Sequence, residues 1–322
     1  MKQALFLLNM GGPSNIPEVK LFLQNMFSDK NILPVNPLAR KLIGTIIVKK
    51  RLHEAEENYQ ALGGKSPLLE LTIKLIEKLQ SKLDMPVYSA MRYVPPFATE
   101  SLEKCKEEGI EELILFPLYP QYSTTTTLSS YEDIQERCSA LGYAPKLTLI
   151  DPYYDEYEYI EASCEKILEA IDGKESKLYD LLLSAHGLPV SIIEAGDPYQ
   201  RHVEANVSAI KIYLKAKGIE FNSIKLVYQS KVGPSAWLEP SLADILRNPT
   251  NKKVVIYPLA FTIDNSETVY ELGIEHAEIA RKIKYEDYKV ASCMNDSDKF
   301  VEFIVQKVKL AQGNYSKTEK TR

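Results

Sequence analysis

The feature that most constrains the fold is an alternation of short apolar runs with amphipathic helical patterns. In the first half of the chain, apolar runs at 4–8, 87–91, 113–118 and 147–150 alternate with helical patterns at about 17–27, 68–83, 98–108 and 129–141. Parallel strands need a crossover connection between them, usually a helix. This order therefore predicts β–α–β units and a parallel sheet.

The alternation begins again after Asp151-Pro152 and a tyrosine-rich bend that leads into a helix ending near 171. We expect strands at 179–184, 224–229, 253–257 and 288–292, and helices at about 200–217, 239–247, 267–283 and 297–311. The predicted fold class is α/β, with two lobes that each contain a four-stranded parallel sheet. The expected boundaries are 1–151 for the first lobe, 152–295 for the second, 296–311 for a helix that packs back on the first lobe, and 312–322 for a frayed tail.

The two halves also resemble each other in detail. Met-Gly-Gly-Pro at 10–13 corresponds to His-Gly-Leu-Pro at 186–189, Arg-Tyr-Val-Pro-Pro at 92–96 to Ser-Lys-Val-Gly-Pro at 230–234, and Leu-Phe-Pro-Leu at 115–118 to Ile-Tyr-Pro-Leu at 256–259. Three matches in the same order favour a duplicated lobe. The alternative is two unrelated α/β lobes with similar turns.

An insertion distinguishes the first lobe from the second. Met10 and His186 are 186 − 10 = 176 positions apart, whereas Pro117 and Pro258 are 258 − 117 = 141 apart. The difference of about 35 residues falls largely between 28 and 66, and connections of that length are usually lids or binding segments. Residues 38–51 alternate apolar and basic blocks. They suit a cover over an apolar, anionic ligand, or an amphipathic helix packed on the core with solvated lysines.

Composition excludes several classes of protein. A net charge of −5 has the wrong sign for an electrostatic nucleic-acid binder. No apolar run approaches the ~20 residues that span a bilayer, and the first residues lack the pattern of a signal peptide. The four cysteines are scattered without a C-x-x-C pair, which indicates neither a disulfide framework nor a structural zinc or iron–sulfur site. We expect a cytoplasmic enzyme or binding protein.

A histidine and a glutamate follow two predicted strands of the second lobe. His186 ends the apolar run at 181–185, and Glu267 comes shortly after the strand at 253–257. Ligands of parallel α/β sheets bind beyond the carboxyl ends of the strands, so both side chains are expected to face one crevice. One imidazole and one or two carboxylates form a sparse site that suits Fe²⁺ or a similar divalent ion, held loosely. Each residue also has a structural explanation, a loop hydrogen bond for His186 and capping of a helix start for Glu267.

The first lobe carries different chemistry. A hydroxyl-rich stretch at 119–127, which includes Tyr122, follows a strand, and cations and aromatics are available at Arg51, Tyr59, Ser66, Arg92 and Tyr93. Together these suit a planar aromatic ligand that carries carboxylates, although a serine and threonine run is also ordinary loop composition. Neither the G-x-G-x-x-G nor the P-loop spacing is present, and there is no G-x-S-x-G elbow.

These motifs together resemble those of the ferrochelatases, enzymes that insert Fe²⁺ into a porphyrin in haem synthesis. The resemblance covers about residues 4–310. Its motifs are Leu-Asn-Met-Gly-Gly-Pro at 8–13, Leu-Gly-Gly-Lys-Ser-Pro-Leu at 62–68, Met-Arg-Tyr-Val at 91–94, Phe-Pro-Leu-Tyr-Pro-Gln-Tyr-Ser at 116–123, Ser-Ala-His-Gly-Leu-Pro at 184–189, Gly-Asp-Pro-Tyr at 196–199, Tyr-Gln-Ser-Lys-Val-Gly-Pro at 228–234, Trp-Leu at 237–238 and Asp264 to Thr268.

The resemblance implies two Rossmann-like lobes with porphyrin in the cleft between them. It implies that His186 and Glu267 are the catalytic and metal-site residues, His186 acting as proton acceptor or as iron ligand. The substrate-binding residues that it implies, together with the strand-end positions above, are Met10, Arg51, Tyr59, Ser66, Arg92, Tyr93 and Tyr122. Asn265 stands where many relatives have histidine, which leaves any metal-entry role of this position undetermined, and Pro95 lies where relatives vary.

The implied reaction is insertion of Fe²⁺ into protoporphyrin IX with release of two protons. We expect no resident cofactor and no 2Fe–2S cluster, because no cysteine follows Cys293. Alternatives are a ferrochelatase acting on coproporphyrin III, a chelatase that loads cobalt into a sirohydrochlorin-type ring, and a porphyrin or haem carrier without turnover. A monomer is favoured, and residues 38–51 could contact a membrane surface.

Overall fold

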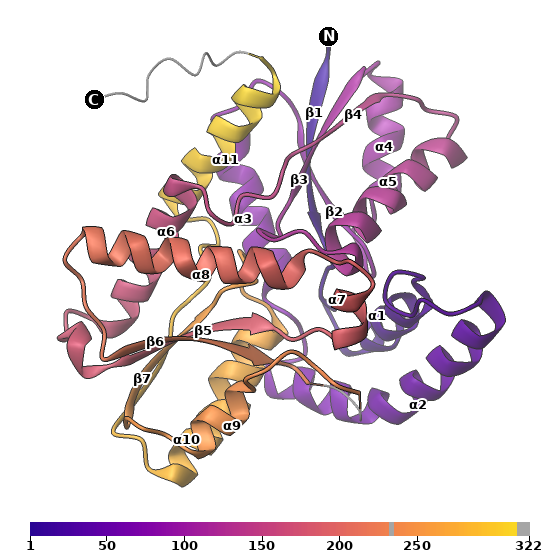
Figure 1. Cartoon of the computed structure of the whole chain (residues 1–322). Coiled ribbons are helices and arrows are strands. Elements are labelled where there is room, and N and C mark those ends of the chain that lie inside the picture. Colours follow the sequence, from indigo (N-terminus) through magenta and orange to yellow (C-terminus); the bar gives the residue numbers. More distant parts are fainter. Residues whose placement is uncertain (232–234, 314–322) are drawn as a thin grey trace. The chain divides into compact units, whose positions relative to one another are not determined.

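The computed structural model describes residues 1–231 and 235–313 (Figure 1). The chain forms two compact units. Among the described residues, unit 1 comprises 1–118, 124–151 and 296–313, and unit 2 comprises 119–123 and the described part of 152–295. Of the frayed tail predicted at 312–322, residues 314–322 lie outside the described residues. Within the described residues, no helix is both long and apolar enough to cross a bilayer.

The sheet of unit 1 consists of β1 (Gln3–Asn9), β2 (Val87–Met91), β3 (Glu112–Pro117) and β4 (Lys146–Leu149), in the order β2-β1-β3-β4. All three pairings are parallel. Its helices are α1 (Ile16–Ser28), α2 (Pro37–Ala61), α3 (Leu68–Gln80), α4 (Ala98–Glu107), α5 (Ser129–Ala140) and α11 (Asp298–Ala311), with a π-helix η1 at Thr124–Leu128.

The core of unit 1 lies on both faces of this sheet. On one face, alternate residues of β1 such as Phe6 and Leu8 pack against α4 and α5. On the other face, Phe116 of β3 meets Phe303 of α11 in an edge contact, with ring centroids 6.5 Å apart. Strands covered on both faces read as continuous apolar runs, which is why these strands were evident in the sequence.

The insertion predicted at about 28–66 forms α2, which packs against α1. Asn15 and Asn36 cap the two helices by accepting hydrogen bonds from backbone N–H groups in their first turns. Gly44 of α2 allows the close approach, since a Cβ there would lie 2.9 Å from the Phe27 carbonyl oxygen. The two helices share an apolar cluster that includes Val19, Val48 and Tyr59.

Unit 2 repeats the strand order of unit 1. Its sheet consists of β5 (Asp180–His186), β6 (Ser223–Gln229), β7 (Lys253–Pro258) and β8 (Asp287–Val290), in the parallel order β6-β5-β7-β8. Its helices are α6 (Tyr157–Ile171), η2 (Ser176–Leu178), α7 (Val190–Glu194), α8 (Tyr199–Ala216), α9 (Leu242–Arg247), a π-helix η3 (Glu267–Glu275) and α10 (His276–Ile283). The predicted fold class is therefore confirmed, and the shared strand order agrees with duplication.

Several details differ from the sequence prediction, including the short helices η1, η2 and α7, which were not predicted. Residues 119–123 belong to unit 2 rather than to the first lobe, because Gln121 donates to Asn206 at 2.9 Å and Ser123 donates to Asp197 at 2.9 Å. The helix expected at 239–247 begins only at Leu242, after Pro240. The helix expected at 267–283 is a π-helix over its first nine residues.

Candidate metal and proton site at the strand ends of unit 2

His186 and Glu267 lie in direct contact in unit 2. His186 is the last residue of β5, and Glu267 is the first residue of η3, which follows the neighbouring strand β7. The imidazole Nδ1 lies 2.7 Å from Oε2 of Glu267. The side chains remain 34% and 32% exposed, so a small ion or a ligand edge can reach both. The structure thus brings together the two residues that the sequence placed beyond neighbouring strand ends.

Two further residues, Ser230 and Glu271, complete the site. Ser230 follows β6, and its hydroxyl oxygen lies 3.0 Å from Oε2 of Glu267 and 2.5 Å from Oε2 of Glu271. Its backbone N–H donates to Oε1 of Glu271 at 2.7 Å. Neither residue had a role predicted from the sequence. The four-residue spacing from Glu267 to Glu271, which puts both on one side of a helix, was the available signal.

A buried chain of hydrogen bonds supports Glu271 from the sheet. The Gln229 side-chain amide donates to Oε2 of Glu271 at 3.2 Å, and its carbonyl oxygen accepts from the Ser184 hydroxyl at 2.8 Å. Gln229 pairs in register with His186, so the same strand pair orients both the imidazole and this amide. The Gln229 side chain therefore links the Ser184 hydroxyl of β5 to the Glu271 carboxyl.

Glu271 is an acid whose proton affinity is unusually high. Burial, and then the negative charge of Glu267, raise the pKa of Glu271 from 4.5 to about 7. The hydrogen bonds from Ser230 and the nearby His186 oppose this rise. A carboxyl with a pKa near neutrality can exchange protons at physiological pH, which a free glutamate cannot do efficiently.

The start of η3 is fixed by capping interactions. Asn265 accepts a hydrogen bond from the Glu267 N–H at 2.8 Å, and Asp264 accepts from the Thr268 hydroxyl at 2.8 Å. Asp264 also accepts from the Asn295 side chain at 2.7 Å. The predicted orientation of Glu267 toward His186 therefore occurs. The N-cap position is Ser266, and the Asn265 side chain, one residue earlier, accepts from the first N–H of the helix.

The residues present can hold a divalent ion only loosely. In the part of the chain that the structure describes, no group of three or more His, Cys, Asp or Glu side chains is arranged to hold a metal. One imidazole nitrogen and one carboxylate leave most of a coordination sphere to water or to another ligand. Such a pair suits an ion that passes through the site.

Arg92 and Tyr93, predicted to bind substrate, are engaged in a buried network of unit 1. The Tyr93 hydroxyl donates to Asp29 at 2.8 Å, and Ser129 also donates to Asp29. The Arg92 guanidinium lies 3.3 Å from Asp29 and 3.2 Å from Asp133. Tyr93 is fully buried, whereas the Arg92 side chain is 21% exposed. The contacts of Tyr93 are therefore structural, and its ligand-binding role stays a prediction.

The remaining predicted substrate-binding residues divide between the units. In unit 1, the Met10 carbonyl accepts from the Tyr93 N–H at 3.0 Å, and Ser66, itself buried, donates its N–H to the Pro13 carbonyl at 2.8 Å. These place Met10 and Ser66 near the carboxyl end of β1. Tyr59 is buried against α1, and Arg51 is partly exposed on α2. Tyr122 belongs to unit 2, where its N–H donates to His202 at 3.2 Å.

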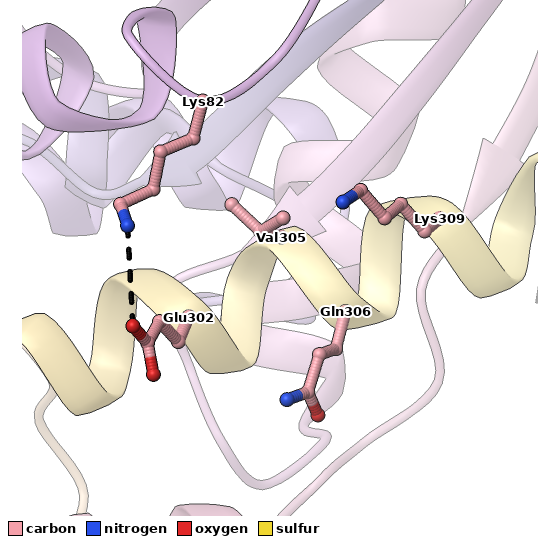
Figure 2. A pocket seen from close by; sticks show the side chains of 5 residues that line it. All are labelled: Lys82, Glu302, Val305, Gln306 and Lys309. Carbon is pink, nitrogen blue, oxygen red and sulfur yellow. Dashed lines mark ion pairs between the residues drawn. The ribbon is translucent and has the colours of Figure 1, made fainter. Parts of the chain in front are cut away.

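A shallow groove of about 350 Å³ lies elsewhere in unit 1, along α11. It is lined by Lys82, Glu302, Val305, Gln306 and Lys309, with Lys82 and Glu302 paired at 3.9 Å (Figure 2). Its lining offers no imidazole, thiol or carboxyl pair. We therefore do not assign metal binding or proton transfer to this groove.

Comparison with known proteins identifies the family. The model of the family described as Ferrochelatase matches residues 2–312. The chain is 48% identical over 318 residues to the ferrochelatase of Wolinella succinogenes, covering 98% of this chain and 100% of that protein. It is 48% identical over 307 residues to the ferrochelatase of Sulfurimonas denitrificans, covering 94% and 97%. The chain belongs to the ferrochelatase family.

Membership of the ferrochelatase family confirms the resemblance inferred from the motifs. It makes the protein a metal chelatase of haem synthesis. Solved structures add agreement of the fold. SirB from Bacillus subtilis with Fe³⁺ superposes with a TM-score of 0.58 at 14% identity, covering 98% of this chain and 97% of that one. CbiX, the terminal enzyme for siroheme biosynthesis in denitrifying bacteria, gives 0.53 at 13% identity, covering 97% and 99%.

Proposed function

We propose that this ferrochelatase inserts Fe²⁺ into protoporphyrin IX, giving protohaem and two protons, with His186 and Glu267 as the catalytic pair. The observation that carries the assignment is the 2.7 Å contact between His186 Nδ1 and Glu267 Oε2 at neighbouring strand ends. Iron and porphyrin are both substrates here. The site therefore has to bind a metal weakly and to accept protons.

Insertion requires two pyrrole N–H groups to lose their protons. The His186 imidazole offers a ring nitrogen as the first proton acceptor. The Glu267 carboxylate in contact with it stabilises the imidazolium that results and can receive the proton in turn. Glu271, with a pKa raised to about 7 by burial and by Glu267, is a third acceptor on the side of the pair toward the sheet.

The metal must also lose water and reach nitrogen lone pairs that a planar ring presents poorly. A ring held in a bent shape exposes these lone pairs. We propose that Met10, Arg51, Tyr59, Ser66, Arg92, Tyr93 and Tyr122 contribute to holding the porphyrin. The exposed part of the Arg92 guanidinium, braced by Asp29 and Asp133, is suited to pair with a ring carboxylate.

We also propose that the reaction proceeds without an iron–sulfur cluster. All four cysteines are buried, and burial raises the pKa of the Cys105 thiol to about 12 and that of Cys138 to about 11. Cluster ligation also requires several cysteines close together, and the four cysteines of this sequence are scattered without a C-x-x-C pair.

The decisive experiment is an anaerobic insertion assay with Fe²⁺ and protoporphyrin IX, followed by the loss of the free-porphyrin absorption bands. His186→Ala and Glu267→Gln should each lower kcat by at least about 100-fold, the usual contribution of general acid–base groups. The exposed Glu278→Gln on α10 is the matched control and should keep the parental rate. Full activity of His186→Ala would disprove the assignment.

The same assay separates the alternative functions. Faster turnover of coproporphyrin III would make that porphyrin the preferred substrate and would leave the proposed roles of His186 and Glu267 unchanged. Binding of porphyrin with no metal insertion by the parent protein would indicate a carrier. Turnover of cobalt with a sirohydrochlorin-type ring in place of iron with porphyrin would indicate the related chelatase.

We further propose a peripheral contact of α2 with anionic membranes. Leu38, Leu42 and Ile46, spaced four apart along one face, are 83%, 65% and 47% exposed. The lysines at 41, 49 and 50 lie on the same helix. An apolar stripe beside basic residues is the pattern of helices that lie in the interface of anionic bilayers.

Liposome flotation tests this contact. The protein should float with vesicles that contain anionic lipid, and Leu42→Gln combined with Ile46→Gln should abolish flotation. Leu310→Gln, which changes an exposed leucine of α11, should have no effect. Equal flotation of the double variant would exclude α2 as the membrane contact.

A further inference from the structure

Ser230 has a backbone conformation that serine adopts rarely. Its φ is +65°, in the left-handed region. Asp172 and Lys284 share this conformation, but they are the C-caps of α6 and α10, where a left-handed residue ends a helix. Ser230 follows a strand and caps no helix. Glycine would adopt the same conformation without steric cost, so the serine side chain needs another explanation.

The contacts of Ser230 supply that explanation. Its N–H and its hydroxyl both reach Glu271, at 2.7 Å from Oε1 and 2.5 Å from Oε2. The same hydroxyl lies 3.0 Å from Oε2 of Glu267. A glycine would keep only the backbone contact. A hydroxyl has one hydrogen to donate, so it connects the two glutamates when it accepts from the protonated Glu271 and donates to the Glu267 carboxylate.

The oxygen of Glu267 that Ser230 contacts is also the one that contacts His186. Oε2 of Glu267 lies 2.7 Å from Nδ1 of His186 and 3.0 Å from the Ser230 hydroxyl. Because the Glu267 side chain is about one-third exposed, packing alone does not determine its orientation. A hydrogen bond from the Ser230 hydroxyl, directly after β6, restricts the carboxylate to the orientation that faces the imidazole.

We propose that Ser230 is a positioning residue for metal insertion, whose hydroxyl holds the Glu267 carboxylate against His186 and ties it to Glu271. This inference rests on the proposed function of the His186–Glu267 pair. The left-handed backbone conformation places the Ser230 N–H at Glu271 and its hydroxyl between Glu271 and Glu267. The strain is retained because the hydroxyl is needed there.

The test compares Ser230→Ala with Ser230→Gly. Both variants remove the hydroxyl, but only glycine relieves the backbone strain. We expect both to lower kcat/KM for Fe²⁺ by about 10- to 100-fold, the range for losing a hydrogen bond to a charged group. The KM for porphyrin should stay within about twofold of the parent. The melting temperature of Ser230→Gly should exceed that of Ser230→Ala.

A purely structural role predicts a different result. If only the turn mattered, Ser230→Gly would retain the parental kcat/KM for Fe²⁺ while Ser230→Ala lost it, and that outcome would overturn the inference. Lys284→Gly is the matched control, since it relieves the same backbone conformation at the end of α10 in the same unit. It should leave turnover unchanged.

Metal binding decides the question if the parent protein proves inactive in insertion. Calorimetric titration of Zn²⁺ into the protein without porphyrin measures metal binding. Subtracting the heat that the His186→Ala variant still gives leaves the binding at the His186–Glu267 pair. A dissociation constant raised about tenfold in both Ser230 variants would support the inference even though the proposed function had failed. An unchanged dissociation constant in both variants would overturn it.

Discussion

At the scale of single residues, the sequence left both a structural and a chemical role open for His186 and for Glu267. A histidine at a strand end and a glutamate in the first turn of a helix each have structural explanations. Both sit at the carboxyl ends of strands that the sheet order makes neighbours, β5 and β7, and the side chains meet at 2.7 Å. The Glu267 N–H donates to the Asn265 side chain and the Glu267 carboxylate faces His186, so the structural and the chemical interpretation coexist.

Glu271 should make the stability of the protein depend on pH. Its pKa is raised from 4.5 to about 7 in the folded state. A raised pKa means that the folded state binds the proton more tightly than the unfolded state. The associated stabilisation is therefore present below about pH 4.5 and is lost as the pH rises through about 7. The full difference corresponds to about 3 kcal/mol.

Glu271→Gln removes this dependence, because the amide stays neutral. We expect the variant to be about as stable as the parent at pH 5 and about 1–3 kcal/mol more stable at pH 8.5. Urea denaturation at the two pH values measures the difference. Glu278→Gln, on an exposed part of α10, should show no such pH dependence. A stability gain of the same size at both pH values would contradict the raised pKa.

At the scale of elements, the inserted helix is the part whose role the periodicity left open. Residues 38–51 were consistent with a cover over a ligand or with a helix packed on the core. In the structure α2 does pack on α1 through residues such as Val48 and Tyr59, yet it leaves Leu38 and Leu42 exposed. One helix thus has a face in the core and a second apolar face that the described residues do not cover.

Phe303 should carry much of the contribution of α11 to unit 1. It is 2% exposed and contacts Phe116 of the central sheet and Phe300 of its own helix. Phe303→Ala leaves a large cavity and should destabilise the protein by about 3–5 kcal/mol. Gln306→Ala, on the exposed groove side of the same helix, should change stability by less than about 0.5 kcal/mol (Figure 2). Chemical denaturation of both variants tests this, and similar losses would argue against α11 as part of the core.

At the scale of the whole molecule, the same strand order occurs in both units but the chemistry does not. Met10 directly follows β1, at the position that corresponds to His186, the last residue of β5: Leu8 pairs with Pro117 as Ser184 pairs with Pro258. Unit 1 carries buried ion pairs around Asp29, whereas unit 2 carries the imidazole and the paired glutamates. The two units therefore share one strand order but differ in the side chains at their strand ends.

The sequence by itself determined the architecture and the principal pair of the site. Strands buried on both faces produce continuous apolar runs, and helices between them produce amphipathic periods, so both the sheets and their helices were predictable. His186 and Glu267 followed because residues just beyond parallel strands converge at one edge of a sheet. These are local patterns whose geometry depends little on distant contacts.

Only the tertiary structure determined the surroundings of that pair. The left-handed backbone of Ser230, the π-helical start of η3 and the raised pKa of Glu271 depend on burial and on neighbours far apart in the chain. The same holds for residues 119–123, whose place in unit 2 rests on hydrogen bonds to Asp197 and Asn206. No periodicity encodes such contacts, because they arise from the packing of elements rather than from the elements themselves.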